Sequence, residues 1–469
     1  MKKSLLLGTM LVAGIAPALA VVDGFKYEAK DGFTCESRWI NDRTSNMSGW
    51  NALPFAPMAS KARTACLAEH NGKDYIVVGW SQTLPYEVNG ETKTDDFATL
   101  VLINFTNGKV EKTVQMTCDG KPVQGLLSAN QVGCDEFGHI WFAGYVATTY
   151  SSETGKSTPL TIYVVDDLEA GTCHKAAELV LPEDEASELS GGRIDYCDLV
   201  GDVTRKEANC TVMVAFANID AYVAAWKCDQ GGTKWTGGMD GYTSLKLADT
   251  YPADQTSWGT APMVRICLDE EYSNNLYYVD GFTTCPTLYD PMGAIIESFA
   301  KAVDLSPKLG TNGLGEFTIK ETPFIAYSIS QYDVTPGCQV RVAKLGVGMT
   351  FEGMQEMWVV PSNGLGEVSD GGTRFHAVET RLYPDANGKE GAYLLTYKCN
   401  NGIGVYAIGE EGWEDPKANY VENIHADELD ANAPVEYFNL NGVAVDGNNL
   451  PAGLYITRQG KTVNKVVVK

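Results

Sequence analysis

The chain has 469 residues, with 36 basic and 60 acidic side chains, which gives a formal net charge of −24 at neutral pH. A field of that sign repels the phosphates of nucleic acids and anionic lipid headgroups, so nucleic acid is excluded as a partner and membrane adsorption is disfavoured. We expect a solvated acidic surface, with a cation-binding role for that surface as the alternative.

Residues 1–20 have the pattern of a secretory signal peptide. Lys2 and Lys3 precede an apolar run from Leu5 to Ile15, and Ala18-Leu19-Ala20 has the small-residue spacing of a cleavage site. Removal of this segment makes the net charge more negative, −26. No later segment approaches about 18 uninterrupted apolar residues, so no integral membrane segment is predicted. We expect export to the periplasm, the cell surface or the medium.

Twelve cysteines follow the signal, an even number that allows complete pairing in an oxidising compartment. Disulfides and buried thiols are both open, and the connectivity does not follow from the sequence. No C-x-x-C motif occurs, and His174, which follows Cys173, has no second pair of ligands nearby. We therefore predict no metal and no cofactor.

Residues 21–408 read as many short antiparallel strands. Runs of Val, Ile, Tyr, Phe and Thr alternate with Gly, Asn, Asp and Pro, and Asn107-Gly108 between two apolar runs is a strong hairpin signal. The exception is "MGAIIESFAKAV", Met292 to Val303, which suits either a short helix or a pair of strands with a polar break.

The strand pattern repeats along the chain. Four copies start 67, 66 and 67 residues apart, and two looser copies follow. Each copy has room for four antiparallel strands, and such units bury their faces by stacking around a ring. The sequence therefore predicts an all-β fold, a β-propeller of six blades, with residues 21–57 supplying either a closing strand or part of a seventh blade. The copies begin at Ala62, Ala129, Asp195, Pro262, Pro323 and Arg374.

The stretch "DEFGHIWFAGY", Asp135 to Tyr145, resembles the turn and second strand of bacterial periplasmic sensor and NHL-type propellers. The resemblance covers one blade and supports the fold. In such a turn the Asp and the Gly serve the backbone geometry rather than a ligand.

Ligands of propellers usually bind where the loops that lead into the innermost strands converge. Here these leading loops combine small residues with aromatic, amide and charged side chains that suit a sugar or a peptide. The alternative is that the tryptophans pack between blades and the arginines pair with inner acids. No catalytic motif is found, so no catalytic residue is predicted. The candidate ligand-binding residues are Trp50, Asn130, Arg193, Asp195, Trp258, Arg374 and His376.

The chain ends in a separate small module. Residues 409–433 are acidic and poor in strand formers, which predicts a linker, and residues 434–469 are basic and β-rich. This ending resembles the C-terminal sorting module of proteins exported by type IX secretion, which implies a secretion apparatus as a partner. A small β cap without a sorting role is the alternative. The matching positions include Tyr437, Asn439, Gly442, Gly453, Tyr455 and Lys469.

Three functions are compatible with these features. The first is an exported binding protein that holds a glycan, peptide or protein partner on its leading-loop face. The second is a propeller hydrolase or lyase acting on polysaccharide, for which carboxylates are abundant. The third is a structural or adhesive surface protein. The sequence favours the first and does not identify the ligand.

Overall fold

The computed structural model describes residues 25–148, 150–151, 156–247, 258–259, 261–267, 276–281, 284–299, 311–329, 338–346, 350–365, 376–417, 435–439, 444–447, 450–451, 453–459 and 462–468. The chain divides into two compact units, Met1–Pro416 and Lys417–Lys469. Each unit is described by itself. Among the described residues, no helix combines the length and the apolar character needed to cross a bilayer.

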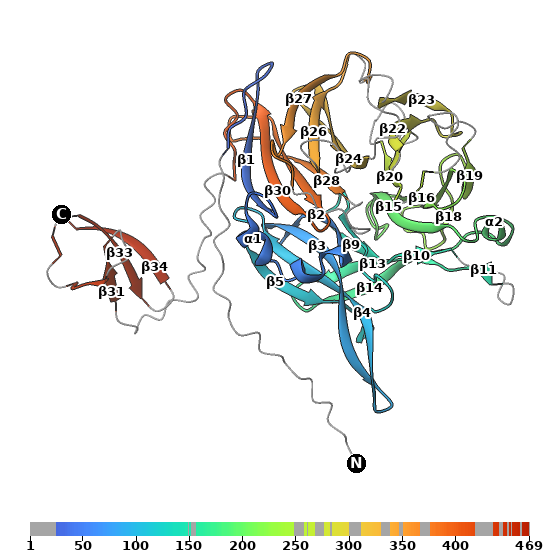
Figure 1. Cartoon of the computed structure of the whole chain (residues 1–469), viewed down its shortest axis with the longest axis horizontal. Coiled ribbons are helices and arrows are strands. Elements are labelled where there is room, and N and C mark those ends of the chain that lie inside the picture. Colours follow the sequence, from blue (N-terminus) through green and yellow to red (C-terminus); the bar gives the residue numbers. More distant parts are fainter. Residues whose placement is uncertain are drawn as a thin grey trace. The chain divides into compact units, whose positions relative to one another are not determined.

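The first unit is a six-bladed β-propeller, with the innermost strand of each blade at the centre (Figure 1). Blades are numbered here in chain order. Blade 1 contains β2 (Ala62–His70), β3 (Lys73–Val88), β4 (Glu91–Asn104) and β5 (Val110–Gln115), in that order from the channel outwards. Blade 2 contains β8 (Gln131–Cys134), β9 (Ile140–Ala143), β13 (Leu160–Asp167) and β14 (Thr172–Leu179), with β6 (Thr117–Cys118) and β7 (Lys121–Pro122) at its outer edge.

Blade 3 is larger than its neighbours. It contains β15 (Arg193–Gly201), β16 (Cys210–Ala217) and β17 (Tyr222–Cys228), extended by β10 (Val146–Ala147), β18 (Thr236–Gly237) and β19 (Ser244–Lys246). The hairpin of β11 (Tyr150–Ser151) and β12 (Lys156–Ser157) and the helix α2 (Glu183–Glu188) lie in the connections that precede β15.

Blades 4 and 5 are plain four-stranded sheets. Blade 4 contains β20 (Met263–Ile266), β21 (Tyr277–Gly281), β22 (Thr284–Tyr289) and β23 (Ile295–Ser298). Blade 5 contains β24 (Thr311–Ile319), β25 (Thr322–Ile329), β26 (Gln339–Lys344) and β27 (Gln355–Val360).

Blade 6 closes the ring with strands from both ends of the unit. Its inner strands are β28 (His376–Leu382), β29 (Gly391–Lys398) and β30 (Gly402–Glu410), and its outermost strand is β1 (Phe33–Asp42). The antiparallel register runs from Phe33 opposite Glu410 to Asp42 opposite Gly402. Residues 21–57 thus supply a closing strand rather than part of a seventh blade. The short helices α1 (Met47–Asn51) and η1 (Ala56–Lys61) connect β1 to blade 1.

Among the described residues, six large hydrophobic clusters form the core, each between two adjacent blades. One of them joins blade 6 to blade 1 through Trp39, Trp80 and Tyr393. Because a four-stranded sheet has two apolar faces, every blade needs a neighbour on each side. Six interfaces among six blades satisfy this need by closing the ring.

The repeats predicted from the sequence match the innermost strands in most blades. Copies expected at Ala62, Ala129, Asp195 and Pro262 begin within two residues of β2, β8, β15 and β20, and the sixth begins just before β28. The fifth prediction is wrong, because Pro323 lies in β25, the second strand of blade 5. The innermost strand β24 reads "TNGLGEFTI", and its two glycines hide the apolar pattern.

The other local predictions have mixed outcomes. The Asn107-Gly108 turn joins β4 to β5. Gly108 has a φ of +67°, and the Trp39 ring is so close that a Cβ added to Gly108 would lie 2.6 Å from Trp39 Cε3. Within Met292–Val303, Ile295–Ser298 forms strand β23, which pairs with β22, and Phe299 is helical, whereas residues 300–303 are outside the described residues. The predicted linker begins inside the fold, because β30 continues to Glu410 and the Trp413 ring lies 6.1 Å from that of Tyr393.

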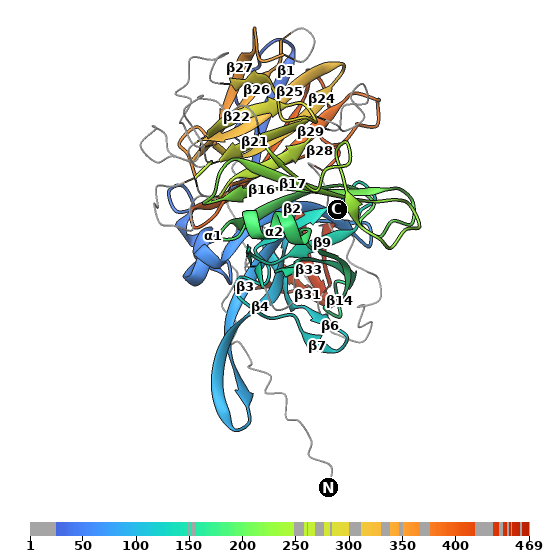
Figure 2. The same ribbon diagram turned by 90° about the vertical axis from the view of Figure 1, so that its right-hand side faces the viewer.

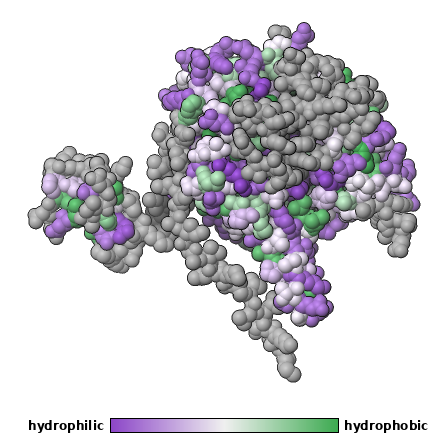
Figure 3. All heavy atoms as spheres, viewed as in Figure 1, coloured by the Kyte–Doolittle hydropathy of each residue, from purple (hydrophilic) through white to green (hydrophobic). Residues whose placement is uncertain are grey.

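The β3–β4 hairpin extends beyond the propeller as a long arm (Figures 1 and 2). Asn89 and Gly90 form its tip, both with positive φ, which is the geometry that matches the twist of a hairpin. Glu87, Glu91 and Lys93 are exposed or half-exposed along the arm, and Figure 3 shows it as largely hydrophilic. Charged side chains on such an edge disfavour pairing with another chain.

Eight cysteines carry free thiols: Cys35, Cys66, Cys118, Cys134, Cys173, Cys197, Cys210 and Cys228. Six of them are buried, and Cys118 and Cys134 are half-buried. Desolvation raises the pKa of the buried Cys173 and of the half-buried Cys134 to about 12. Most of these eight cysteines are therefore buried thiols, which is one of the two alternatives left open by the sequence.

The second unit contains one four-stranded sheet in the order β32 (Ala444–Val445), β31 (Val435–Phe438), β33 (Gly453–Gln459) and β34 (Thr462–Val468). Tyr437 lies in β31, opposite Val445 and Thr457, and the Tyr455 hydroxyl donates to the Pro451 carbonyl at 3.0 Å. Of the predicted sorting positions, Asn439 follows β31 and Gly453 begins β33, whereas Gly442 and Lys469 are outside the described residues. The sorting role stays a prediction.

Candidate functional site

The six innermost strands enclose a cavity of about 350 Å³, called here the channel pocket. All six blades contribute, mostly from the second halves of these strands, so the pocket lies at the end of the channel towards which the strands run. The lining residues are Leu67, Cys134, Asp135, Glu136, Gly138, Asp198, Leu199, Val200, Arg265, Ile266, Gly315, Glu316, Val378, Glu379, Thr380 and Arg381.

Charged side chains dominate this lining. Among the described residues, the lining contains five carboxyl groups and two guanidinium groups, and no aromatic side chain. Low-dielectric walls concentrate the field of the excess negative charge inside such a cavity. The pocket is therefore suited to a polar ligand, and its field favours a positive charge.

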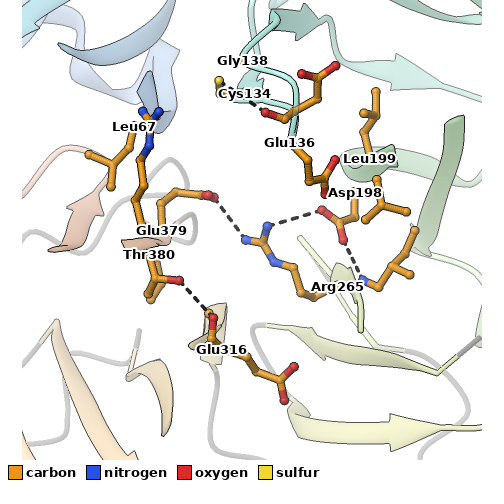
Figure 4. Close-up of a pocket in the computed structure, with 16 residues that line it drawn as sticks. Leu67, Cys134, Glu136, Gly138, Asp198, Leu199, Arg265, Glu316, Glu379 and Thr380 are labelled. Atoms are coloured by element: carbon orange, nitrogen blue, oxygen red, sulfur yellow. Dashed lines mark hydrogen bonds and ion pairs between the residues drawn. The ribbon is translucent and has the colours of Figure 1, made fainter. Parts of the chain in front are cut away.

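Arg265 connects three blades across the pocket (Figure 4). Its Nη1 lies 3.3 Å from Asp198 Oδ1 in blade 3, and its Nη2 lies 3.2 Å from Glu379 Oε1 in blade 6. The guanidinium carbon is also 5.8 Å from the centre of the Tyr196 ring, within cation–π range. One cation thus holds two carboxylates that approach from opposite sides.

Of the two acids that Arg265 holds, Asp198 is the more deeply buried. Its side chain is 7% exposed, and Oδ2 accepts the backbone N–H of Ile266 at 2.6 Å. Burial raises its pKa to about 6, although Arg265 and the backbone donors oppose this rise. Asp198 therefore changes its charge within the range of mildly acidic solutions.

Glu136 lies in the turn after β8, at the mouth of the pocket. The residue as a whole is exposed, yet its carboxyl group is surrounded by protein atoms, and this desolvation raises its pKa to about 7. Its Oε2 accepts the backbone N–H of Gly201 at 2.8 Å, which holds the side chain against blade 3. At neutral pH a large share of Glu136 is protonated beside charged neighbours.

Glu316, Thr380 and Arg381 complete the lining. The Tyr278 hydroxyl donates to the Glu316 carboxylate, and Thr380 Oγ1 donates to the Glu316 carbonyl at 3.0 Å. Arg381 Nη2 lies 3.8 Å from Glu69, which draws this cation towards blade 1. These contacts leave the acids in excess within the pocket.

The structure brings three of the sequence-predicted residues together at the other end of the channel. Arg193 Nη2 is 2.6 Å from Asp195 Oδ2, and Asn130 Nδ2 donates to the Asp195 carbonyl at 2.6 Å. Arg63 donates to Asn130 Oδ1 at 3.2 Å, and the Ala261 N–H donates to Asp195 at 3.3 Å. Asn130 and Asp195 are fully buried, so this cluster ties the starts of the innermost strands together.

Trp50 and Trp258 require a correction. Each is 1% exposed, so neither ring is available to stack on a ligand. Trp50 packs in the cluster between blades 6 and 1, and Trp258 packs in the cluster between blades 3 and 4. This is the packing alternative stated for these residues. Arg374 is outside the described residues, and His376 begins β28 opposite Lys398.

A second cavity, of about 410 Å³, lies beside the loop that leads into β8. Leu126, which is 68% exposed, and the half-buried Tyr145 are among its lining residues. The Arg193 guanidinium carbon is 5.9 Å from the centre of the Tyr145 ring. The aromatic side chains on this face are thus tyrosines that the sequence analysis did not select.

Asp135, His139 and Asp202 bring their ligand atoms within 4.8 Å of one another. However, Asp135 accepts the backbone N–H groups of Phe137, His139 and Val203, and Asp202 accepts those of Thr204, Lys206 and Glu207. These donors occupy the carboxylate oxygens that a metal would need. The Asp135 turn therefore has the structural role expected for it, and it fixes blade 2 to blade 3.

No protein-family model matches this chain, and no curated protein matches it in sequence. Among solved structures, a xylan β-1,4-xylosidase from Bacillus halodurans is 10% identical with a TM-score of 0.32, and the match covers 59% of this chain and 52% of that one. The allergen Mala s 1 of Malassezia sympodialis is 10% identical over 78% of this chain and 97% of its own, with a TM-score of 0.40. An α-L-arabinanase from Penicillium chrysogenum is 12% identical over 76% and 95%, with a TM-score of 0.41. At these values no activity or residue role is transferred to this chain.

Sequence reasoning missed the channel pocket, although the repeat contained a signal for it. Asp198 and Arg265 are 67 residues apart, which equals the spacing between copies, so both occupy the same place in successive blades. Charged residues are unusual in the buried innermost strand of a blade. Charges at corresponding places in several copies would have indicated the pocket.

Proposed function

We propose that this is an exported binding protein whose channel pocket holds a polar ligand through a positively charged group, an ammonium or a guanidinium. The observation that carries the proposal is the excess of five carboxyl groups over two guanidinium groups in a cavity of about 350 Å³. A basic peptide side chain and an amino sugar both present this chemistry, so the proposal keeps the peptide and glycan partners expected from the sequence. It changes the place at which they bind.

The lining supports recognition by charge rather than by stacking. Sugar sites usually use a flat aromatic ring beside polar groups, whereas the lining residues in the described part of the chain include no aromatic side chain. Glu379 is only partly buried, with 28% of its side chain exposed, so a ligand can reach it. The signal peptide and the sorting-like module add the proposal that binding takes place outside the inner membrane.

Titration calorimetry of the full chain tests this function. The probes are a lysine-rich peptide, a glucosamine oligosaccharide and the same oligosaccharide with acetylated amines. We expect binding of at least one amine probe, no binding of the acetylated probe, and about tenfold weaker binding by Glu379→Gln, equal to about 1.4 kcal/mol. Glu178→Gln is the matched control, because Glu178 is exposed on β14 and pairs only with Lys175. Equal binding of charged and acetylated probes would rule the proposal out.

Glycoside hydrolysis is the second candidate, and Glu136 favours it. Glu136, a carboxyl group with a pKa of about 7, lines the same pocket as Glu379, and two carboxyl groups at one site are the equipment of a glycoside hydrolase. The test is the release of reducing sugar from a panel of polysaccharides. This candidate requires release by the wild type and loss of at least about 100-fold in Glu136→Gln. It fails if no polysaccharide is cleaved.

A further inference from the structure

Two thiols meet at the outer edge of blade 2. Cys118 lies in β6 and Cys173 lies in β14, and the two residues are partners in the parallel register of these strands. Paired residues in neighbouring strands lie about 5 Å apart and direct their side chains to the same face of the sheet. A disulfide needs a Cα separation of about 4.4–6.8 Å, so this pairing has the required reach.

The two thiols are also close enough to influence each other. Burial and the neighbouring Cys118 thiol raise the pKa of Cys173, and the Cys173 thiol donates to the Thr117 carbonyl at 3.3 Å. The strands are held in place by Thr117, whose N–H donates to the Gly171 carbonyl at 2.8 Å. No backbone movement is therefore needed to bring the two sulfur atoms together.

Exposure distinguishes this pair from another in the propeller. Cys210 and Cys228 also face each other in register, on β16 and β17, but both are fully buried within blade 3. Cys118 is half-exposed, so a soluble oxidant can reach its sulfur atom.

We propose that Cys118 and Cys173 form a disulfide in an oxidising compartment, which ties the connection between blades 1 and 2 to the last strand of blade 2. The proposal rests on the proposed export of the protein and is independent of the ligand of the channel pocket. A low-molecular-weight disulfide such as oxidised glutathione serves as the oxidant.

The chemistry is two successive thiol–disulfide exchanges. The Cys118 thiolate attacks oxidised glutathione, forms a mixed disulfide and releases one glutathione thiolate. The Cys173 thiolate then attacks the Cys118 sulfur of that mixed disulfide, and a second glutathione thiolate leaves. The two cysteines lose two electrons and two protons in total, and the oxidant is reduced to two glutathione thiols. Because burial raises the pKa of Cys173 to about 12, we expect faster closure as the pH rises above neutral.

The test uses the folded full chain, incubated with oxidised glutathione, blocked with an alkylating reagent under denaturing conditions, digested and analysed by mass spectrometry. The expected product is a linked pair of peptides containing Cys118 and Cys173, lighter than the two separate peptides by two hydrogen atoms. It should be absent from Cys118→Ser and from Cys173→Ser. It should persist in Cys134→Ser, because Cys134 is half-exposed in β8 and no cysteine faces it in the β8–β9 register.

The linkage should also be visible in stability. Closing a loop of more than 50 residues restricts the unfolded chain, so the oxidised wild type should melt at least a few degrees above the reduced wild type, with no such difference in Cys118→Ser. Alkylation of both thiols after oxidation would overturn the proposal. So would a mixed disulfide that stays on Cys118, or a linkage of either cysteine to another residue. Circular dichroism of each variant establishes that it has folded before the comparison is made.

Discussion

The two ends of the central channel are built by the same six strands and have opposite character. Where the strands begin, Asn130 and Asp195 are buried, and each already has polar partners on a neighbouring blade or strand. At the opposite end, towards which the strands run, Asp198 and Glu379 both pair with Arg265, and all three side chains line the channel pocket. The polar residues where the strands begin thus use their hydrogen bonds to hold the blades together. The polar residues where the strands end surround a cavity with an excess of acidic groups, which a ligand can enter.

The largest expected effect concerns the closed end. Asp195→Ala removes the carboxylate that holds Arg193 and the Ala261 N–H, and it leaves a half-buried guanidinium without its partner. We expect the free energy of unfolding to fall by about 3 kcal/mol, measured with guanidinium chloride. Asp229→Ala is the control, because the Asp229 side chain is 82% exposed, and it should change stability by less than about 0.5 kcal/mol. A change as small as the control's would show that this cluster does not hold the ring.

A smaller effect is expected from Arg265→Met in the channel pocket. The substitution keeps much of the side-chain volume but removes the cation shared by Asp198 and Glu379. We expect a loss of about 2 kcal/mol in stability, since Asp198 can take up a proton and limit the cost. Binding of a cationic ligand should strengthen, in contrast to its weakening in Glu379→Gln. Weaker binding in both variants would mean that Arg265 itself contacts the ligand.

The third prediction concerns the pH dependence of Asp198. Its pKa is raised from 3.8 to about 6 in the folded protein, so the native state binds a proton more readily than the unfolded state. The contribution of this group to stability is therefore fully present below about pH 3.8 and is lost as the pH rises through 6.

Comparison with Asp198→Asn isolates that contribution. Between pH 7 and pH 4.5 the wild type should gain about 2 kcal/mol relative to this variant, measured by guanidinium unfolding at both pH values. Asp280, whose pKa is also raised by burial, is present in both proteins and cancels in the difference. Glu136 cancels only in part, because the charge of Asp198 contributes to the raised pKa of Glu136. A difference that stays constant with pH would show that Asp198 is charged in both conditions.

The fold was largely predictable because propeller blades are local structures. Each hairpin signal lies within about 20 residues, and copies such as those at Ala62 and Pro262 repeat it. The pattern failed in β24, where Gly313 and Gly315 interrupt the apolar run. Although β24 was not recognised, the predicted number of blades stayed correct, because the other strands of blade 5 were recognised as one copy of the repeat.

The candidate site was less predictable because it depends on distances between blades. Asp198, Arg265 and Glu379 are separated by 67 and 114 residues, and no local pattern states that they meet. Trp50 and Trp258 failed as candidates for a related reason. Trp258 lies shortly before β20, and Trp50 lies in helix α1, which precedes β2, but the interfaces between blades bury both rings.

The smallest expected effect is a test of the face that the sequence analysis favoured. Tyr145 and Leu126 line the cavity beside the loop that leads into β8, and Arg193 lies over the Tyr145 ring. If the ligand binds in the channel pocket, Tyr145→Ala and Leu126→Ser should each leave the affinity for a cationic probe within about twofold, because neither side chain lines that pocket. Calorimetry with the probe that binds the wild type measures this, with Glu379→Gln as the variant that must lose affinity. If Tyr145→Ala loses binding and Glu379→Gln binds as the wild type does, the assignment of the ligand to the channel pocket is wrong. The aromatic cavity would then be the ligand site, and the charges of the channel would serve only to hold blades 3, 4 and 6 together.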